Sequence, residues 1–185
     1  MTDALPWLAF ALLAGVLVGA AVMDARTGRV PNALTIGGTL AGLALWAAGG
    51  WLWRTDVDGM DAVWGMLAAL VPFALIYFLG GLGGGDVKLM AAVGALTANW
   101  QCVVATALYA FVAAAIMAVV VMISKRLVLR TVLRVLHAAF AWRAGQKVDL
   151  DTDSPRIPFA VAACAGGLLG GAEYLLGLQL PWTNF

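Results

Sequence analysis

Apolar residues run through this chain in long stretches that short polar segments separate. A helix that crosses the hydrocarbon core of a membrane needs about 20 apolar residues, with roughly 17–25 as the usual range. The pattern predicts six spans, at residues 6–23, 31–50, 60–80, 87–98, 102–123 and 157–178. The fourth is short, and it reaches an adequate length only if it begins at Asp86 and runs to Trp100, or if it borders a water-filled cavity.

Composition supports the same class of protein. Of the 185 residues, 63% are apolar and 11% are charged, against roughly 45–50% and about 25% in soluble domains. We therefore predict an all-α, polytopic membrane bundle that forms a single domain over residues 1–185. A net charge of +1 gives no reason to propose nucleic acid as a partner. Cys102 and Cys164 form no CxxC pair, so we predict small buried apolar residues rather than a metal site.

The distribution of charge predicts the orientation of the chain. Residues 1–6 contain Asp3 and no Lys or Arg, so the first apolar run is predicted to be a retained span rather than a signal peptide. If the N-terminus lies outside, every Lys and Arg except Arg54 falls on the cytoplasmic side. This agrees with the positive-inside rule and with an even number of crossings.

One long polar connection, residues 124–156, joins the last two predicted spans. Arg126, Arg130 and Arg134 recur every four residues there, as one stripe of a helix. Such a helix would lie on the cytoplasmic leaflet and attract anionic lipids. A role in docking the substrate is the alternative. His137 has no His or Cys neighbour at metal spacing, so we interpret it as an ordinary interfacial residue.

Two carboxylates at the cytoplasmic ends of predicted spans are the candidates for chemistry. Asp24 follows the first span in MDARTGRVPN, and Asp86 closes a glycine-rich run in GGLGGGDVKL. A carboxylate at membrane depth costs about 2.5–3.5 kcal/mol, so it usually has a function. Two carboxylates in one partly desolvated site cannot both ionise easily, so one holds a proton while the other stays charged. Such a pair can activate water and hydrolyse a peptide without a metal or cofactor.

The glycines before Asp86, which include Gly83 and Gly85, have two interpretations. They would let the backbone bend and leave N–H and C=O groups exposed near the site, where a substrate strand could pair. The alternative is a flexible connection between helices.

Three segments of the sequence resemble the bacterial type IV prepilin peptidases, membrane aspartic proteases with a GxGD motif. The segment from Gly83 to Lys88 resembles the GxGDxK motif of that family. Asp24, Arg26 and the pair Pro31-Asn32 resemble its first-aspartate segment. Residues 156–160, RIPFA, resemble the stretch that opens its last helix.

The resemblance implies that Asp24 and Asp86 are the catalytic aspartates. They would remove a short basic leader, after a glycine, from type IV or Flp-type prepilins or pilin-like subunits. The place would be the cytoplasmic face of the bacterial inner membrane, and membrane lipids and pilus assembly machinery would be further partners. Larger members also carry a cysteine-bearing methyltransferase domain. Residues 24–30 leave no room for one, so the chain resembles the short peptidase-only branch that serves Flp or tight-adherence pili.

Three further residues are candidates for supporting roles. The charges of Lys88 and Arg26 would help an aspartate to ionise or bind a substrate carboxylate, although both also suit positive-inside anchoring. Asn32 would hydrogen-bond the site or cap the second helix.

Two other classes of protein remain open on the residues alone. One is a small proton- or cation-coupled transporter, although such carriers place their sites near the bilayer midplane. The other is a non-catalytic scaffold for a pilus or secretion apparatus.

Overall fold

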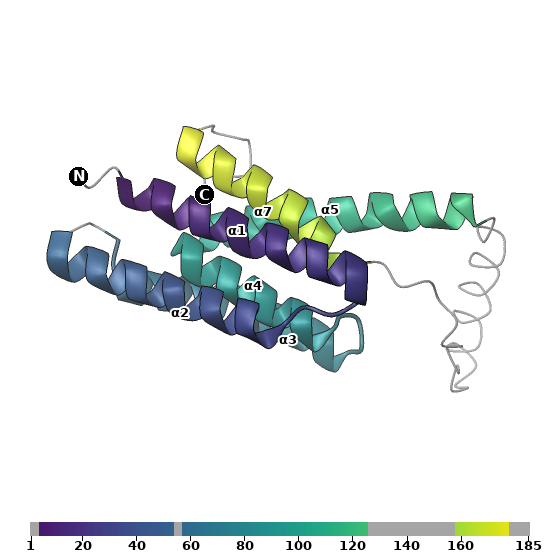
Figure 1. Cartoon of the computed structure of the whole chain (residues 1–185), viewed down its shortest axis with the longest axis horizontal. Coiled ribbons are helices and arrows are strands. Elements are labelled where there is room, and N and C mark those ends of the chain that lie inside the picture. Colours follow the sequence, from purple (N-terminus) through teal and green to yellow (C-terminus); the bar gives the residue numbers. More distant parts are fainter. Residues whose placement is uncertain (1–3, 54–56, 126–157, 178–185) are drawn as a thin grey trace. The chain divides into compact units, whose positions relative to one another are not determined.

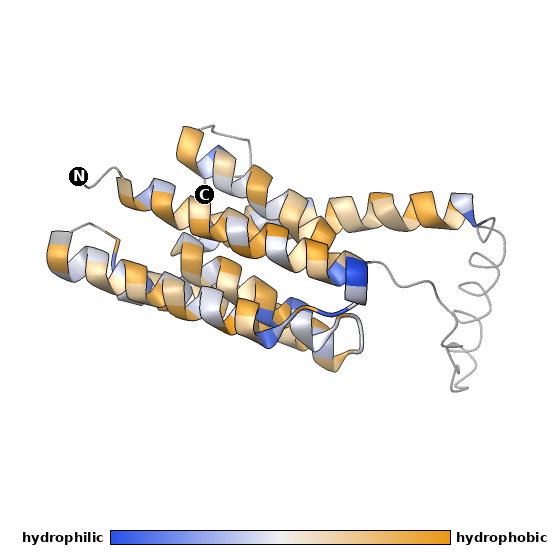
Figure 2. Ribbon diagram, in the orientation of Figure 1, coloured by the Kyte–Doolittle hydropathy of each residue, from blue (hydrophilic) through white to orange (hydrophobic). Residues whose placement is uncertain are grey.

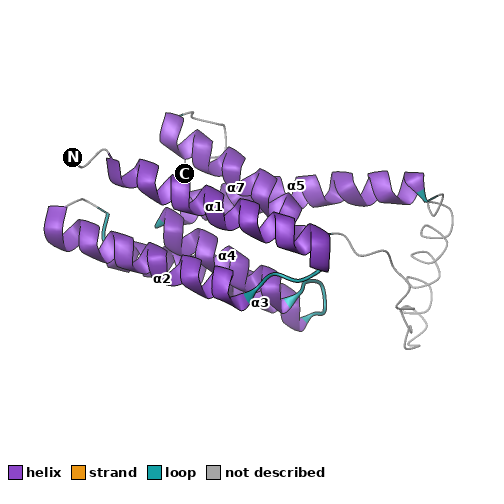
Figure 3. Ribbon diagram, viewed as in Figure 1, coloured by secondary structure: helices purple, strands orange, loops and turns teal. Residues whose placement is uncertain are grey.

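The structure is a computed structural model that describes residues 4–53, 57–125 and 158–177. Every regular element among these residues is a helix, as Figure 3 shows. The elements are α1 (Ala4–Thr27), α2 (Asn32–Ala48), the π-helical turn η1 (Gly49–Trp53), α3 (Gly59–Phe78), α4 (Gly84–Thr97), α5 (Trp100–Ser124) and α7 (Phe159–Leu176).

The chain divides into two compact units. The first unit combines Met1–Ala113 with Pro158–Phe185, and the second is Ala114–Ile157. Both candidate aspartates belong to the first unit. Of the basic segment 124–156, only Ser124 and Lys125 lie within the described residues. The predicted Arg stripe and His137 lie outside them. A single domain over the whole chain stays a prediction.

Five of the described helices are long and apolar enough to cross a membrane. They occupy Ala4–Thr27, Asn32–Leu52, Gly59–Phe78, Trp100–Ser124 and Phe159–Leu176, and Figure 2 shows apolar residues along all of them. The prediction of a polytopic helical membrane protein is confirmed. The fourth predicted span is α4, which has 14 residues and is about 21 Å long, shorter than the roughly 30 Å hydrocarbon core, so it is not among these five helices.

Helix α4 lies among the other helices of the first unit (Figure 1). It contacts α1, α2, α3 and α7, and each of its residues from Leu89 to Leu96 is buried. A helix that is surrounded by protein has no polar face, which explains why its sequence is apolar all round although it is short.

Glycines allow the backbone of α4 to approach its neighbours closely. A Cβ added at Gly94 would overlap the carbonyl oxygen of Gly65 on α3. A Cβ at Gly42 on α2 would lie 2.7 Å from the carbonyl of Ala95. Beside this contact the indole Nε1 of Trp46 donates to the carbonyl of Leu96 at 2.9 Å. Small residues are the usual means of close packing between membrane helices, and here they hold α4 between α2 and α3.

The two cysteines occupy different environments, and both are free thiols. Cys102 is buried, as predicted, whereas Cys164 is only half-buried, so the prediction of burial is wrong for Cys164. On α7, the same helix as Cys164, Glu173 is buried and accepts a 2.8 Å hydrogen bond from the Tyr109 hydroxyl of α5. The hydrogen bond satisfies one oxygen of a carboxyl group that would otherwise be costly to bury.

Candidate functional site

The end of α1 and the start of α2 are joined by a tight turn at one end of the first unit. Gly28 has φ +65°, a left-handed conformation that suits glycine, and its N–H donates to the carbonyl of Asp24 at 2.8 Å. Pro31 then precedes α2 with φ −65°. Hydrophilic residues gather at this turn in Figure 2. The turn fixes Asp24 in the last turn of α1.

This turn lies against the start of α4. A Cβ added at Gly85 would lie 3.5 Å from the Cβ of Val30, so residue 85 must stay small for the two segments to remain in contact. Asp86 is the next residue, in the first turn of α4. The sequence places Asp24 and Asp86 on different helices, and the structure brings them to the same end of the bundle, near enough for the charge of Asp24 to act on Asp86.

The Asp86 carboxyl is partly buried, outside the five helices of membrane length. Its Oδ2 accepts a hydrogen bond from the backbone N–H of Gly83 at 3.3 Å. Burial raises the pKa of Asp86 to about 6, the bond from Gly83 opposes this rise, and the negative charge of Asp24 adds to it. Asp86 therefore holds its proton to a higher pH than an ordinary aspartate.

Asp24 is half-buried, and its carboxylate contacts the start of α7. The backbone N–H of Ala160, the second residue of that helix, donates to Asp24 Oδ2 at 3.1 Å. Ala160 belongs to the RIPFA segment, whose first two residues lie outside the described part of the chain. Sequence reasoning assigned no role to this segment. The available signal was Pro158, because proline often precedes or opens a helix whose first N–H groups are unpaired.

The glycine-rich run is more ordered than an exposed loop. Gly84 and Gly85 already belong to α4. The N–H groups of Gly80 and Gly81 donate to the carbonyls of Tyr77 and Ile76, both at 2.9 Å, and that of Gly83 donates to Asp86. The expectation that the run presents free N–H groups to a substrate strand is therefore wrong for these three glycines.

The three candidates for supporting roles, Lys88, Asn32 and Arg26, are exposed at the end of the first unit that holds the two aspartates. The Lys88 ammonium donates to Oδ1 of Asn32 at 3.0 Å, which links the first turn of α4 to the first turn of α2. Pro31, rather than Asn32, stands at the N-cap of α2. Arg26 is exposed in the last turn of α1. Among the described residues, no group of three or more His, Cys, Asp and Glu side chains gathers as a metal site.

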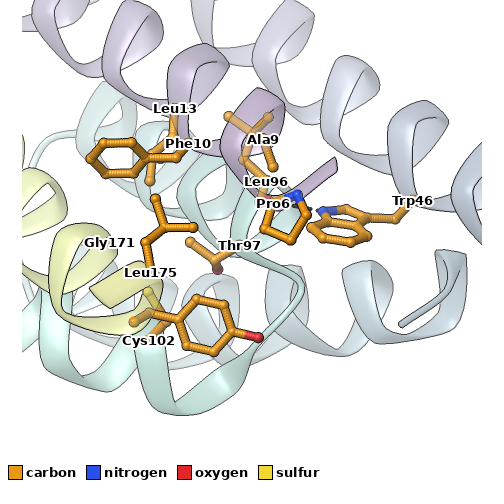
Figure 4. Close-up of a pocket in the computed structure, with 11 residues that line it drawn as sticks. Pro6, Ala9, Phe10, Leu13, Trp46, Leu96, Thr97, Cys102, Gly171 and Leu175 are labelled. Atoms are coloured by element: carbon orange, nitrogen blue, oxygen red, sulfur yellow. Dashed lines mark hydrogen bonds between the residues drawn. The ribbon is translucent and has the colours of Figure 1, made fainter. Parts of the chain in front are cut away.

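A cavity in the first unit lies away from the aspartates. It is a partly open pocket between α1, α2, α4, α5 and α7, and Figure 4 shows its lining. Leu13 lines it eleven residues before Asp24, which is about 16 Å along the axis of α1. Trp46 and Gly171 line other parts of its wall. The cavity is therefore not the space between the two carboxyl groups.

Comparisons with known proteins agree with this geometry. Residues 11–119 match the type IV leader peptidase family. The leader peptidase HopD of Salmonella typhimurium is 38% identical over 124 residues, which cover 62% of this chain and 71% of HopD. No solved structure matches the chain. The matched segment contains both aspartates and the turns that position them, and the chain therefore belongs to the type IV leader peptidase family, as a prepilin peptidase and a membrane hydrolase.

Proposed function

We propose that this prepilin peptidase is an aspartic endopeptidase in which Asp24 and Asp86 act on one water molecule. The observation that carries the proposal is the placement of both carboxyl groups at one end of the bundle, where burial and the charge of Asp24 raise the pKa of Asp86 to about 6. A pair of carboxyl groups in opposite protonation states can act as base and acid.

The reaction follows from these two states. The charged Asp24 takes a proton from water as the water oxygen attacks the peptide carbonyl carbon, and the neutral Asp86 protonates the carbonyl oxygen. When the intermediate collapses, Asp24 passes its proton to the leaving nitrogen and the C–N bond breaks. Asp86 then recovers its proton from the oxygen, so the pair returns to its starting state.

The proposal also covers which substrate is cleaved and on which side of the membrane the site lies. The basic residues Arg26, Arg29 and Lys88 lie at the site's end of the first unit, which favours a cytoplasmic position for that end. The protein then lies in the bacterial inner membrane, with its N-terminus on the side away from the cytoplasm. The connection between α1 and α2 is short, which fits the peptidase-only branch and a Flp-type prepilin as substrate. Arg26, exposed beside Asp24, is proposed to contact the substrate. Membership of a peptidase family favours this role over a transporter or a scaffold.

Replacement of either aspartate tests the paired mechanism. We expect Asp24→Asn and Asp86→Asn each to reduce leader removal from a co-expressed Flp-type prepilin by at least about 100-fold, because each change removes a proton-transfer group. The measurement is the gel shift of the mature pilin at matched enzyme levels. Asp61→Asn is the matched control, since Asp61 lies in the first turn of α3, and it is the other end of α3 that leads to Asp86 at the start of α4. Full cleavage by either site variant would reject the mechanism.

The pH dependence of cleavage tests the protonation state of Asp86. Because the neutral form is lost above about pH 6, kcat/KM is expected to fall on the alkaline side, about tenfold per pH unit. Gly83 has φ −82°, so Gly83→Pro fits the backbone and removes the N–H that opposes the raised pKa. The alkaline limb should move to higher pH in this variant.

Gly83→Ala is the control for the proline variant. A Cβ at residue 83 lies 3.1 Å from Asp86 Oδ2 in both variants, but alanine keeps the N–H. The two variants should therefore share any effect of crowding and differ in the position of the alkaline limb. Identical limbs would mean that the Gly83 bond does not act on the catalytic proton.

The hydrogen bond between Lys88 and Asn32 is proposed to position α4 rather than to tune its carboxyl group, because Lys88 is not among the groups that shift the pKa of Asp86. Lys88→Met and Asn32→Ala should each lower kcat/KM several-fold. The kcat/KM of the double variant should be no lower than that of the less active single variant, because both changes remove the same hydrogen bond. The pH profile should stay in place. A profile that moves in Lys88→Met, or losses that multiply, would indicate instead that the ammonium acts by its charge.

A further inference from the structure

The first turn of α7 receives no side-chain cap from its own N-cap residue. Pro158 stands at the N-cap and offers no side-chain hydrogen bond. The N–H groups of a first helical turn have no partner inside the helix, and this end of a helix favours negative charge. Here the carboxylate of Asp24, 136 residues earlier in the chain, accepts the N–H of Ala160. A residue of α1 therefore caps α7.

The contacts between α1 and α7 repeat in a fixed register. Asp24 meets Ala160 through a hydrogen bond. A Cβ added at Gly167 would overlap Leu17, and one at Gly171 would lie 3.4 Å from Leu13. Steps of seven and then four residues separate these positions on both helices, in opposite chain directions, as Figure 1 shows for α1 and α7. Residues at such spacing share one face of a helix, so one continuous interface ends at the Asp24 carboxylate.

The interface is closely packed at Leu17. This side chain is 0% exposed and does not line the pocket, so it has no open space into which it could turn. A methyl group at Gly167 would therefore separate the two helices. The hydrogen bond between Asp24 and Ala160 is 3.1 Å long, and a small separation would break it, because hydrogen bonds weaken beyond about 3.2 Å.

We propose that α7 is a positioning element for catalysis, whose glycine register against α1 holds the Ala160 N–H on Asp24 and so keeps the Asp24 carboxylate correctly oriented as the base. This inference rests on the proposed function of the two aspartates. It assigns a role to a helix that lies beyond residues 11–119, the part of the chain that matches the peptidase family. Ala160 and Gly167 are positioning residues, since they act through Asp24.

A cycle of Gly167→Ala, Leu17→Ala and the double variant tests the register. Gly167→Ala alone should lower kcat/KM roughly 10- to 100-fold. The loss should lie in kcat, with KM unchanged, because Asp24 is misoriented while the substrate still binds. In the double variant the truncated Leu17 makes room for the new methyl group, so kcat should recover. Gly15→Ala is the control, since nothing lies within 4 Å of a Cβ there.

Ala160→Pro is a second, direct variant. It removes the N–H in the first turn of a helix, where proline is tolerated, and it should lower kcat with KM unchanged, as Gly167→Ala does. The folded fraction of each variant is followed by thermal unfolding in detergent. If kcat falls only in proportion to the folded fraction, or if the double variant does not recover, α7 has a structural role alone and the inference is overturned.

The experiments distinguish a failure of the proposed function from a failure of the positioning role of α7. If Asp24→Asn and Asp86→Asn still cleave, the proposed function is wrong. If both are inactive while Gly167→Ala and Ala160→Pro cleave with the kcat and KM of the parent, the paired mechanism stands and the positioning role of α7 is rejected.

Discussion

The contact between the backbones of α3 and α4 at Gly65 and Gly94 is the constraint on which the rest of the first unit depends. Lipid tails are as apolar as leucine side chains, so burial of apolar surface does little to bring membrane helices together. Close packing must replace it. With glycine on both sides, α4 comes near enough to α3 for its backbone to be part of the interface, and α2 closes on it in the same way at Gly42. A short helix can therefore be held at the centre of longer ones.

The central position of α4 determines the burial of the candidate site. Since α4 begins at Gly84 and is shorter than its neighbours, its first turn lies where the end of α1 and the starts of α2 and α7 can reach it. Asp86 is then partly buried although it lies near one end of the bundle. Asp24 reaches the same place from α1 and is held there by the start of α7. Each carboxyl group accepts a hydrogen bond from a backbone N–H at a helix start, so the site is built from helix ends and few side chains.

Much of this was predictable from the sequence, and what was not has an identifiable physical cause. Runs of apolar residues determine helix length directly, so five membrane-length helices, Asp24 at the end of one of them and Asp86 at the start of an apolar run followed from composition and spacing. The short length of α4 could be read from the sequence. Its burial among other helices could not, because a helix buried in protein and a helix exposed to lipid have the same apolar pattern. The register between helices also leaves no periodic signal. Ala160 acts through its backbone N–H, which every residue except proline carries. The partner of Lys88 depends on how α2 lies on α4, and sequence spacing does not contain that information.

The most direct test of the central claim is whether residues 24 and 86 meet in the membrane. Asp24→Cys and Asp86→Cys are combined in a chain whose Cys102 and Cys164 are replaced by alanine, with a protease site engineered between α2 and α3. Membranes are treated with a short bifunctional thiol reagent and then cut. The account predicts that the two fragments stay joined, whereas a control pair of Asp24→Cys with Asp61→Cys gives separate fragments. Separate fragments from the first pair, or equal joining in both, would contradict a shared site for the two carboxyl groups.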